Sequence, residues 1–292
     1  MSISAVKKKL GDAGVDVKPV VWWLREFSLK QAVREAKRVD LLEKLRMIVP
    51  DEEITGQGFS EKTDTSVSRL KRRGLHAFQC LLMLKALESL PKGRLTVVDV
   101  GDSAGTHMRY LSKLTEDNFD IDTISVNLDE RAIERIKARG MEAVHSRAED
   151  LSLGDRAIDL FASFQMVEHL HNPSIFFRRL AKKSKGERIL LTVPYVKKSR
   201  VGLHHLRNGF CHPIRAEEEH IFELNPEDWT LLFLHSGWRV THSEVYYQYP
   251  RKWPVLRWLW SKFWKLTDYE GFWGAILEKD TAYSDCYQDW EK

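Results

Sequence analysis

The chain has 292 residues, of which 43% are hydrophobic, and its 46 Lys and Arg against 42 Asp and Glu give a net charge of +4. This composition can bury a sizeable core and excludes a wholly disordered chain. The cysteines are too few and too scattered for a disulfide framework or a cysteine-based zinc site, since there are only Cys80, Cys211 and Cys286.

Residues 1–90 are predicted to form a helical extension that could act as a lid. Residues 1–50 have helical patterning, and the stretch Lys30–Ile48 places apolar side chains at helical spacings among many charges. Residues 51–68 are polar and aperiodic, which predicts a loop or lid segment. Residues 69–90 return to the spacing of an amphipathic helix.

From residue 91 onward, short β-branched runs alternate with helical segments. This alternation predicts right-handed βαβ units and a mostly parallel sheet with helices on both faces. The predicted strands are 95–100, 121–128, 142–145, 158–164, 188–193, 240–249 and 272–277. The predicted helices are 106–114, 130–139, one starting near Pro173, and 226–236.

A turn with two glycines follows the first predicted strand, at Gly101 and Gly105, and runs into a helix. Glycine permits a tight turn and a close approach of the backbone to a ligand. Such turns lie at the carboxyl ends of strands, where open α/β sheets bind their ligands. The glycine spacing excludes a P-loop and disfavours a nicotinamide dinucleotide site.

Six stretches in this order resemble the class I S-adenosylmethionine-dependent methyltransferases over residues 75–280: 99–105, 125–129, 146–151, 159–173, 189–194 and 220–238. Asp99, Gly101 and Gly105 match the family's D-x-G-x-x-x-G turn, and residues 159–173 are similar to its D-L-V-x-S-x-x-V-L-E-H-L-x-D-P stretch. Residues 220–229 resemble its H-x-x-F-T-P-E-E-L segment. The resemblance implies a Rossmann-like, mostly parallel seven-stranded sheet and a methyltransferase domain over residues 91–292.

The resemblance also implies a site for S-adenosylmethionine. The glycine turn would hold the methionine and ribose, the second strand's end the ribose hydroxyls, the third strand's end the adenine, and the fourth strand's end the methyl group. The matching residues are Asp99, Gly101, Ser103, Gly105, Asn127, Leu128, Ala148, Glu149 and Gln165. Asn127 and Gln165 stand where relatives carry acids, so a non-catalytic cofactor-binding or scaffold protein of the same fold remains an alternative.

Histidines are the candidate general bases, because a hydroxyl acceptor must lose a proton and imidazole titrates near neutral pH. His220 is the first choice and His169 the second. His204, His205 and His212 share the long insertion 195–220. Glu168, His169 and His220 resemble part of the metal-binding pattern of small-RNA 2′-O-methyltransferases, but that pattern has Glu where Gln165 stands, so the sequence predicts no metal.

A second insertion, at 250–270, contains a Trp-rich amphipathic helix with five basic residues and no acid over residues 251–266. Tryptophan with Lys and Arg on such a helix is typical of an anchor at a membrane interface. A core helix or a homodimer contact is the alternative. Because Met1–Leu10 lacks the apolar run of a secretory signal and no long apolar stretch exists, we expect a cytoplasmic protein, peripheral at the inner face of the membrane.

Together these features predict a methyltransferase, with a sugar hydroxyl of a membrane-associated or lipid-linked surface glycan as acceptor. An RNA methyltransferase is a further alternative, with Lys71, Arg72 and Arg73 or the pair Lys197 and Lys198 as phosphate contacts.

Overall fold

The computed structural model of the chain describes residues 17–55, 65–91, 93–183, 186–209, 215 and 218–288. Helices come first along the described chain. They are α2 (Lys18–Glu35), α3 (Val39–Ile48), α4 (Asp51–Thr55) and α5 (Ser66–Glu88). Helix α4 lies where the sequence predicted a loop, and residues 56–64 of that loop lie outside the described residues.

The helical patterning predicted over Lys30–Ile48 is confirmed but divided between two helices, because the chain turns between α2 and α3. Lys37 there adopts a positive φ of 54°, which ends the helix. The turn places the guanidinium of Arg38 5.2 Å from the ring centre of Phe78 and 5.3 Å from that of Tyr246. Cation–π packing and the redirected apolar face of α3 therefore override the local helical pattern.

A seven-stranded sheet confirms the predicted Rossmann-like fold. Its order is β3-β2-β1-β4-β5-β9-β8; β1 to β5 are mutually parallel, whereas β9 runs antiparallel to both β5 and β8. The strands are β1 (Arg94–Val100), β2 (Asp120–Asn127), β3 (Glu142–His145), β4 (Leu160–Phe164), β5 (Arg188–Pro194), β8 (Trp238–Tyr247) and β9 (Gly271–Lys279).

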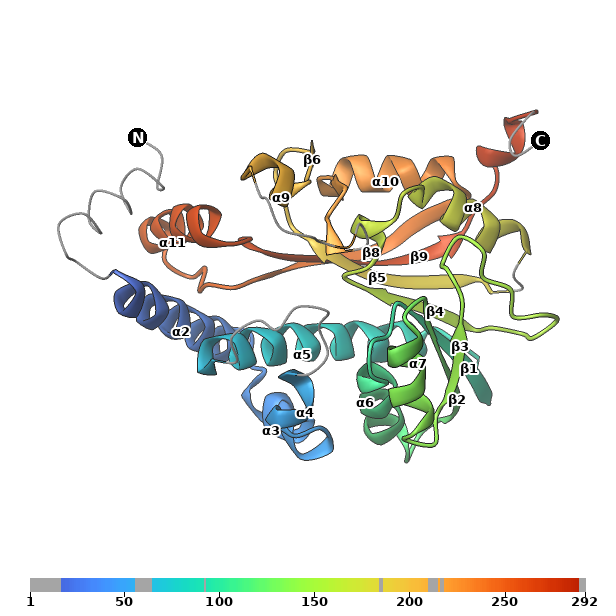
Figure 1. Cartoon of the computed structure of the whole chain (residues 1–292), viewed down its shortest axis with the longest axis horizontal. Helices are drawn as coiled ribbons and strands as arrows, with labels where there is room; N and C mark the ends of the chain where they lie inside the picture. Colours follow the sequence, from blue (N-terminus) through green and yellow to red (C-terminus); the bar gives the residue numbers. More distant parts are fainter. Residues whose placement is uncertain are drawn as a thin grey trace.

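Helices cover both faces of the sheet, as Figure 1 shows. They are α5, α6 (Thr106–Thr115) and α7 (Glu130–Lys137) on one face, and α8 (Pro173–Lys183) and α10 (Pro226–His235) on the other. Because successive strand residues point to opposite faces, Val97 packs in the core beneath α5 and α6, and Val98 packs in the core beneath α8 and α10. The alternation gives the sheet two buried cores and leaves its strand ends for ligands.

The insertion after β5 folds back toward the carboxyl ends of the strands. It contains β6 (Arg200–Val201), α9 (His204–Arg207) and β7 (Phe222–Glu223), and β6 pairs antiparallel with β7. The backbone N–H of Ile221 donates to the carbonyl of Glu168 at 2.8 Å, next to the 3₁₀ turn η1 (Val167–His169). This bond brings two segments about fifty residues apart into contact. A last 3₁₀ turn, η3 (Ser284–Cys286), follows β9.

The Trp-rich segment forms helix α11 (Pro254–Thr267), which lies beside α2 at one end of the molecule (Figure 1). The indole N–H of Trp264, which is fully buried, donates to Ser28 Oγ at 3.1 Å, and Phe27 stacks on Trp260. One face of α11 is thus a packing face. No helix among the described segments is long and apolar enough to cross a membrane.

Candidate active site

A cleft of about 460 Å³ opens at the carboxyl ends of β1, β2 and β4. Nine of the predicted site residues line it: Gly101, Ser103, Asn127, Leu128, Ala148, Glu149, Gln165, His169 and His220. Two more predicted residues, Asp99 and Gly105, lie outside the lining and shape the turn from behind. The structure therefore brings predicted residues from five separate stretches of the sequence to one cavity.

The glycine turn requires glycine at the two positions where its backbone is most constrained. Gly101 has φ of +97°, and a Cβ there would lie 2.6 Å from Cγ of Met166. Gly105 has φ of +71° and begins α6, with Met141 Sδ 2.8 Å from the position of an added Cβ. The turn is therefore a bare backbone cradle on the floor of the cleft.

The side chain that organises this turn is Asp102, which sequence reasoning missed. Its Oδ1 accepts the backbone N–H of Ala104 at 3.1 Å and of Gly105 at 2.8 Å, and its Oδ2 accepts the hydroxyl of Ser125 at 2.8 Å. The sequence signal that could have identified Asp102 is an acidic residue directly after the first glycine of the turn. Asp99 is buried beneath the turn, where burial and the charge of Asp102 raise its pKa well above the usual range.

Asn127 occupies the position where the methyltransferase pattern usually has an acid, and its surroundings explain the amide. The side-chain N–H of Asn127 donates to the carbonyl of Asp102 at 2.9 Å, and its Oδ1 accepts the N–H of Asp129 at 2.8 Å. A carboxylate could make the second bond but not the first, because it has no proton to donate. The amide therefore joins the end of β2 to the glycine turn.

We expect Asn127→Asp to lower the free energy of unfolding by about 1–3 kcal/mol, because it leaves a buried carbonyl without its donor and adds an anion near buried Asp102. Urea denaturation of the ligand-free protein measures this. The matched control is Asn118→Asp, at an exposed loop position. Equal denaturation midpoints for the two variants would contradict the structural role of the amide.

Gln165, the other departure from the pattern, is held against β5. It has a positive φ of 55°, its backbone N–H donates to the carbonyl of Thr192 at 2.8 Å, and its side-chain amide donates to the hydroxyl of that residue at 3.2 Å. This conformation fixes the bend by which the chain leaves β4 and places Gln165 in the cleft wall.

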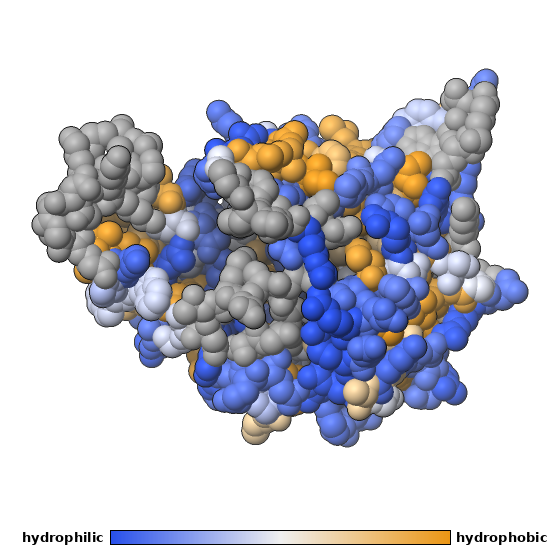
Figure 2. Space-filling view, viewed as in Figure 1, coloured by the Kyte–Doolittle hydropathy of each residue, from blue (hydrophilic) through white to orange (hydrophobic). Residues whose placement is uncertain are grey.

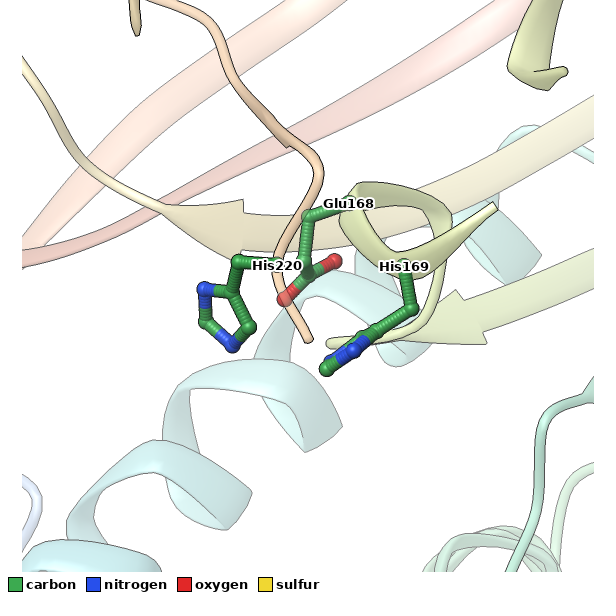
Figure 3. A group of neighbouring side chains, drawn as sticks. All are labelled: Glu168, His169 and His220. Atoms are coloured by element: carbon green, nitrogen blue, oxygen red, sulfur yellow. The ribbon is translucent and has the colours of Figure 1, made fainter. Parts of the chain in front are cut away.

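His169 and His220 meet in the lining of the cleft, with ring centres 4.6 Å apart. Nδ1 of His169 lies 3.0 Å from the carbonyl of Glu219, and Nδ1 of His220 lies 3.0 Å from the hydroxyl of Tyr269. Behind both rings lies Glu168, which is 1% exposed (Figure 3). Burial is the main cause that raises its pKa to about 7; the nearby Glu223 adds to the rise and His220 opposes it.

Glu223 forms the opposite kind of environment. Its carboxylate accepts hydrogen bonds from Tyr269, His204 and Arg200. Although burial acts to raise its pKa, these bonds and His220 hold the pKa of Glu223 well below the usual range. It is therefore an anion that orients His220 through Tyr269. Neither Glu223 nor Tyr269 was selected from the sequence, because Tyr269 is 49 residues from His220 and no spacing rule connects them.

The other predicted histidines have separate positions. His205 lines the cleft and bonds to Glu219, whereas His204 belongs to the Glu223 group. His212 lies outside the described residues. Several further residues line the cleft but were not predicted from the sequence, because only the fold of the chain brings them there: Ser146, Arg147, Phe164, Met166, His171 and Glu218.

The basic run on which the RNA alternative depends makes contacts inside the protein. Lys71 pairs with Asp268 at 2.5 Å, and Arg72 donates to the carbonyl of Ile54 at 3.1 Å. Arg73 is 1% exposed and donates to Tyr110 and Asp51 at 2.7 and 2.6 Å. Lys197 lies 3.5 Å from Glu270. These contacts leave little of the run for phosphates.

The sequence of this domain matches a family model described as a methyltransferase domain, over residues 98–190. A Mycobacterium tuberculosis protein known in two strains as a probable S-adenosylmethionine-dependent methyltransferase, Rv3030 and MT3114, is 27% identical over 117 residues. That match covers 39% of this chain and 39% of the relative, so the chain spans well under half the length of the curated relatives it matches.

Solved structures share the fold at low sequence identity. The methyltransferase in the complex with the Haloferax volcanii Trm112 activator has a TM-score of 0.52 at 15% identity, covering 73% of this chain and 93% of that chain. A sarcosine dimethylglycine methyltransferase from Galdieria sulphuraria has a TM-score of 0.52 at 11% identity, covering 86% and 98%. A Burkholderia thailandensis N1-methyltransferase with bound S-adenosylhomocysteine has a TM-score of 0.50 at 12% identity, covering 70% of this chain and 78% of that chain.

Proposed function

Residues 98–190 of this chain belong to the class I S-adenosylmethionine-dependent methyltransferase family, and from this premise we propose that the protein methylates a hydroxyl group of a sugar in a membrane-associated or lipid-linked surface glycan. The observation that carries the proposal is one cleft lined both by a bare glycine turn and by two histidines.

The residues of the cleft fit S-adenosylmethionine. Gly101 has no Cβ, which would collide with Met166, so its backbone lines the cleft directly. Ser103 lines the cleft as well. Asn127 would face the ribose hydroxyls, while Ala148 and Glu149 would hold the adenine through a backbone N–H and a carboxylate. When bound, the cofactor supplies an electrophilic methyl group on a sulfonium centre. Gln165 also lines the cleft.

The acceptor would bind beside the histidines. A hydroxyl oxygen attacks a methyl group only as its proton is removed or its charge is stabilised, so a group must lie beside it. His220 and His169 line the cleft, and Tyr269 with anionic Glu223 holds the His220 ring in one orientation. We assign to these two histidines the activation of the acceptor hydroxyl. His205, also in the lining, would contact the sugar.

The membrane part of the proposal rests on the outer faces of α2 and α11. Together these helices expose apolar side chains that soluble surfaces rarely gather in one place. They are Val20, Trp22, Trp23 and Phe27 on α2, and Trp253, Val255, Leu256, Trp258, Leu259 and Leu266 at α11, with Trp253 70% exposed. Figure 2 shows hydrophobic surface at this end of the molecule.

Charge favours an anionic bilayer as the partner of this surface. Residues 251–266 carry five basic side chains and no acid, and Lys262 lies over the ring of Trp258 at 3.7 Å. Aromatic side chains flanked by lysine and arginine match the boundary between acyl chains and anionic headgroups. A protein docked there would meet acceptors that are themselves anchored in the membrane.

We expect the double variant Trp253→Ala/Trp258→Ala to bind vesicles containing phosphatidylglycerol about tenfold more weakly, since two exposed indoles can no longer be buried in the interface. Co-sedimentation with vesicles measures the change. The matched control is Met47→Ala/Leu231→Ala, which removes two exposed apolar side chains elsewhere. Absent vesicle binding together with a dimeric mass by light scattering would overturn the membrane assignment.

Calorimetric titration with S-adenosylmethionine and S-adenosylhomocysteine tests the cofactor assignment, and we expect micromolar binding of both. Transfer of radiolabelled methyl groups to a glycolipid fraction, compared with an RNA fraction, tests the acceptor class. Cofactor binding without turnover on any hydroxyl acceptor would favour the non-catalytic alternative. No binding at millimolar concentration would overturn the proposed function.

A further inference from the structure

The carboxylate of Glu168 is buried, and the charge of His220 offsets only part of the effect of that burial. Its side chain is 1% exposed, and neither carboxylate oxygen has a hydrogen-bond partner among the residues that the structure describes. A carboxyl group buried in this way either holds a proton or requires a compensating cation, because an ionised carboxylate without a partner is costly to bury. Such an exception in a folded protein calls for a ligand or a function.

Two imidazoles share this space with the carboxylate. One ring nitrogen each of His169 and His220 and one oxygen of Glu168 all lie within 4.8 Å of one another. Figure 3 shows the carboxylate directed toward the gap between the rings. Ligand atoms around a tetrahedral zinc ion lie about 3.4 Å apart, as bond lengths near 2.1 Å require. Rotamer adjustments of about an ångström would therefore close the set on one ion.

Hydrogen bonds fix the tautomers that a metal ion needs. The carbonyl of Glu219 can only accept, so Nδ1 of His169 carries the proton and Nε2 of the neutral ring carries a lone pair. The hydroxyl of Tyr269 donates to Glu223 and therefore accepts from Nδ1 of His220, which gives the same tautomer. Metal-binding histidines are commonly oriented by such outer hydrogen bonds to a carbonyl or to a carboxylate.

A second group is formed by His204, His220 and Glu223, whose ligand atoms also lie within 4.8 Å of one another. This group has a different role. The carboxylate of Glu223 already accepts from Arg200, His204 and Tyr269, so it gains little from an ion. It acts as the outer layer that supports His220. The carboxylate without a hydrogen-bond partner among the described residues is that of Glu168.

We propose that Glu168, His169 and His220 bind one divalent first-row transition-metal ion, with its remaining coordination positions open to the cleft that both histidines line. Two imidazoles and one carboxylate favour zinc, iron, cobalt or manganese over magnesium. The sequence predicted no metal because Gln165 stands where an acid was expected. In the structure Gln165 bonds to Thr192 and lies outside the set, and three protein ligands with an open position are sufficient for a catalytic metal.

One consequence rests on the proposed function. An acceptor hydroxyl bound to the ion would lose its proton more readily, as metal-bound water does. The oxygen–methyl bond would form as the sulfur–methyl bond breaks, and the hydroxyl proton would pass to solvent water. His169 and His220 would then activate the acceptor as ligands of the ion rather than by taking the proton themselves.

Titration of the chelator-treated protein with Co²⁺, without cofactor or acceptor, tests the site, because histidine-bound Co²⁺ absorbs visible light. We expect one equivalent to bind and Zn²⁺ to displace it. Glu168→Gln and His220→Gln should each weaken binding by about 100-fold. The matched control is His242→Gln, which removes a histidine 3.6 Å from Glu244 on β8; it should bind Co²⁺ like the wild type.

The proposal is overturned if the wild type takes up no ion at 1 mM Co²⁺ or Zn²⁺ (on the order of the weakest affinity expected of a protein site). It is also overturned if both site variants bind as the wild type does. S-adenosylhomocysteine titration of the same samples separates the two proposals. Ion binding without cofactor binding would uphold the metal site and remove the methyltransferase assignment, and the reverse result would do the opposite.

Discussion

Gly101→Arg is expected to abolish cofactor binding while the protein stays folded. The native backbone at this position has φ of +97°, and a Cβ would lie 2.6 Å from Cγ of Met166 in the cleft wall. The variant therefore strains the turn and fills the cradle with a long cationic side chain. We expect the dissociation constant for S-adenosylhomocysteine to rise more than ~100-fold, which corresponds to about 2.8 kcal/mol.

Calorimetry measures the affinity, and far-UV circular dichroism checks the fold. Gly140→Arg is the matched control, because Gly140 also has a positive φ, of +74°, but an added Cβ there meets nothing within 4 Å. The control also places a side chain at a positive φ, but outside the cleft, so it should bind the cofactor with wild-type affinity. Equal affinities for the two variants would mean that the cofactor does not use the glycine turn.

His220→Ala is expected to lower kcat of methyl transfer by about 10²–10⁴-fold and to leave the affinity for S-adenosylhomocysteine within about twofold, as for loss of a group that activates the acceptor hydroxyl. The ring lines the cleft and is held by Tyr269, and it belongs to a different segment of the chain from the glycine turn. This separation of kcat from cofactor affinity distinguishes a group acting on the acceptor from one that binds the cofactor.

Two comparisons sharpen the experiment. Tyr269→Phe removes only the hydroxyl that orients His220, so we expect a smaller loss of about tenfold. His242→Ala, on β8 and outside the cleft lining, should keep the wild-type rate. A His220→Ala variant with unchanged turnover on a hydroxyl acceptor would show that another group activates it.

Hydrophobic periodicity and glycine placement were enough to predict the architecture. Runs such as 95–100 and 188–193 are continuous and β-branched, because a strand of a covered parallel sheet is buried on both faces, and this signal is local. The signal for the turn at Gly101 is local too, because this glycine directly follows a predicted strand. The local pattern over Lys30–Ile48 did not reveal the turn between α2 and α3, where Arg38 packs on Phe78 and Tyr246.

The site illustrates the limit of local signals. The sequence predicted the alternating strands and helices and the glycine turn, because each is marked by residues adjacent in the chain, and it proposed His169 and His220 as candidates. Only the tertiary structure decided that the two rings meet over a buried Glu168 and that Tyr269 orients one of them. Burial and hydrogen bonding between segments 49 residues apart depend on the path of the whole chain, which no local pattern encodes.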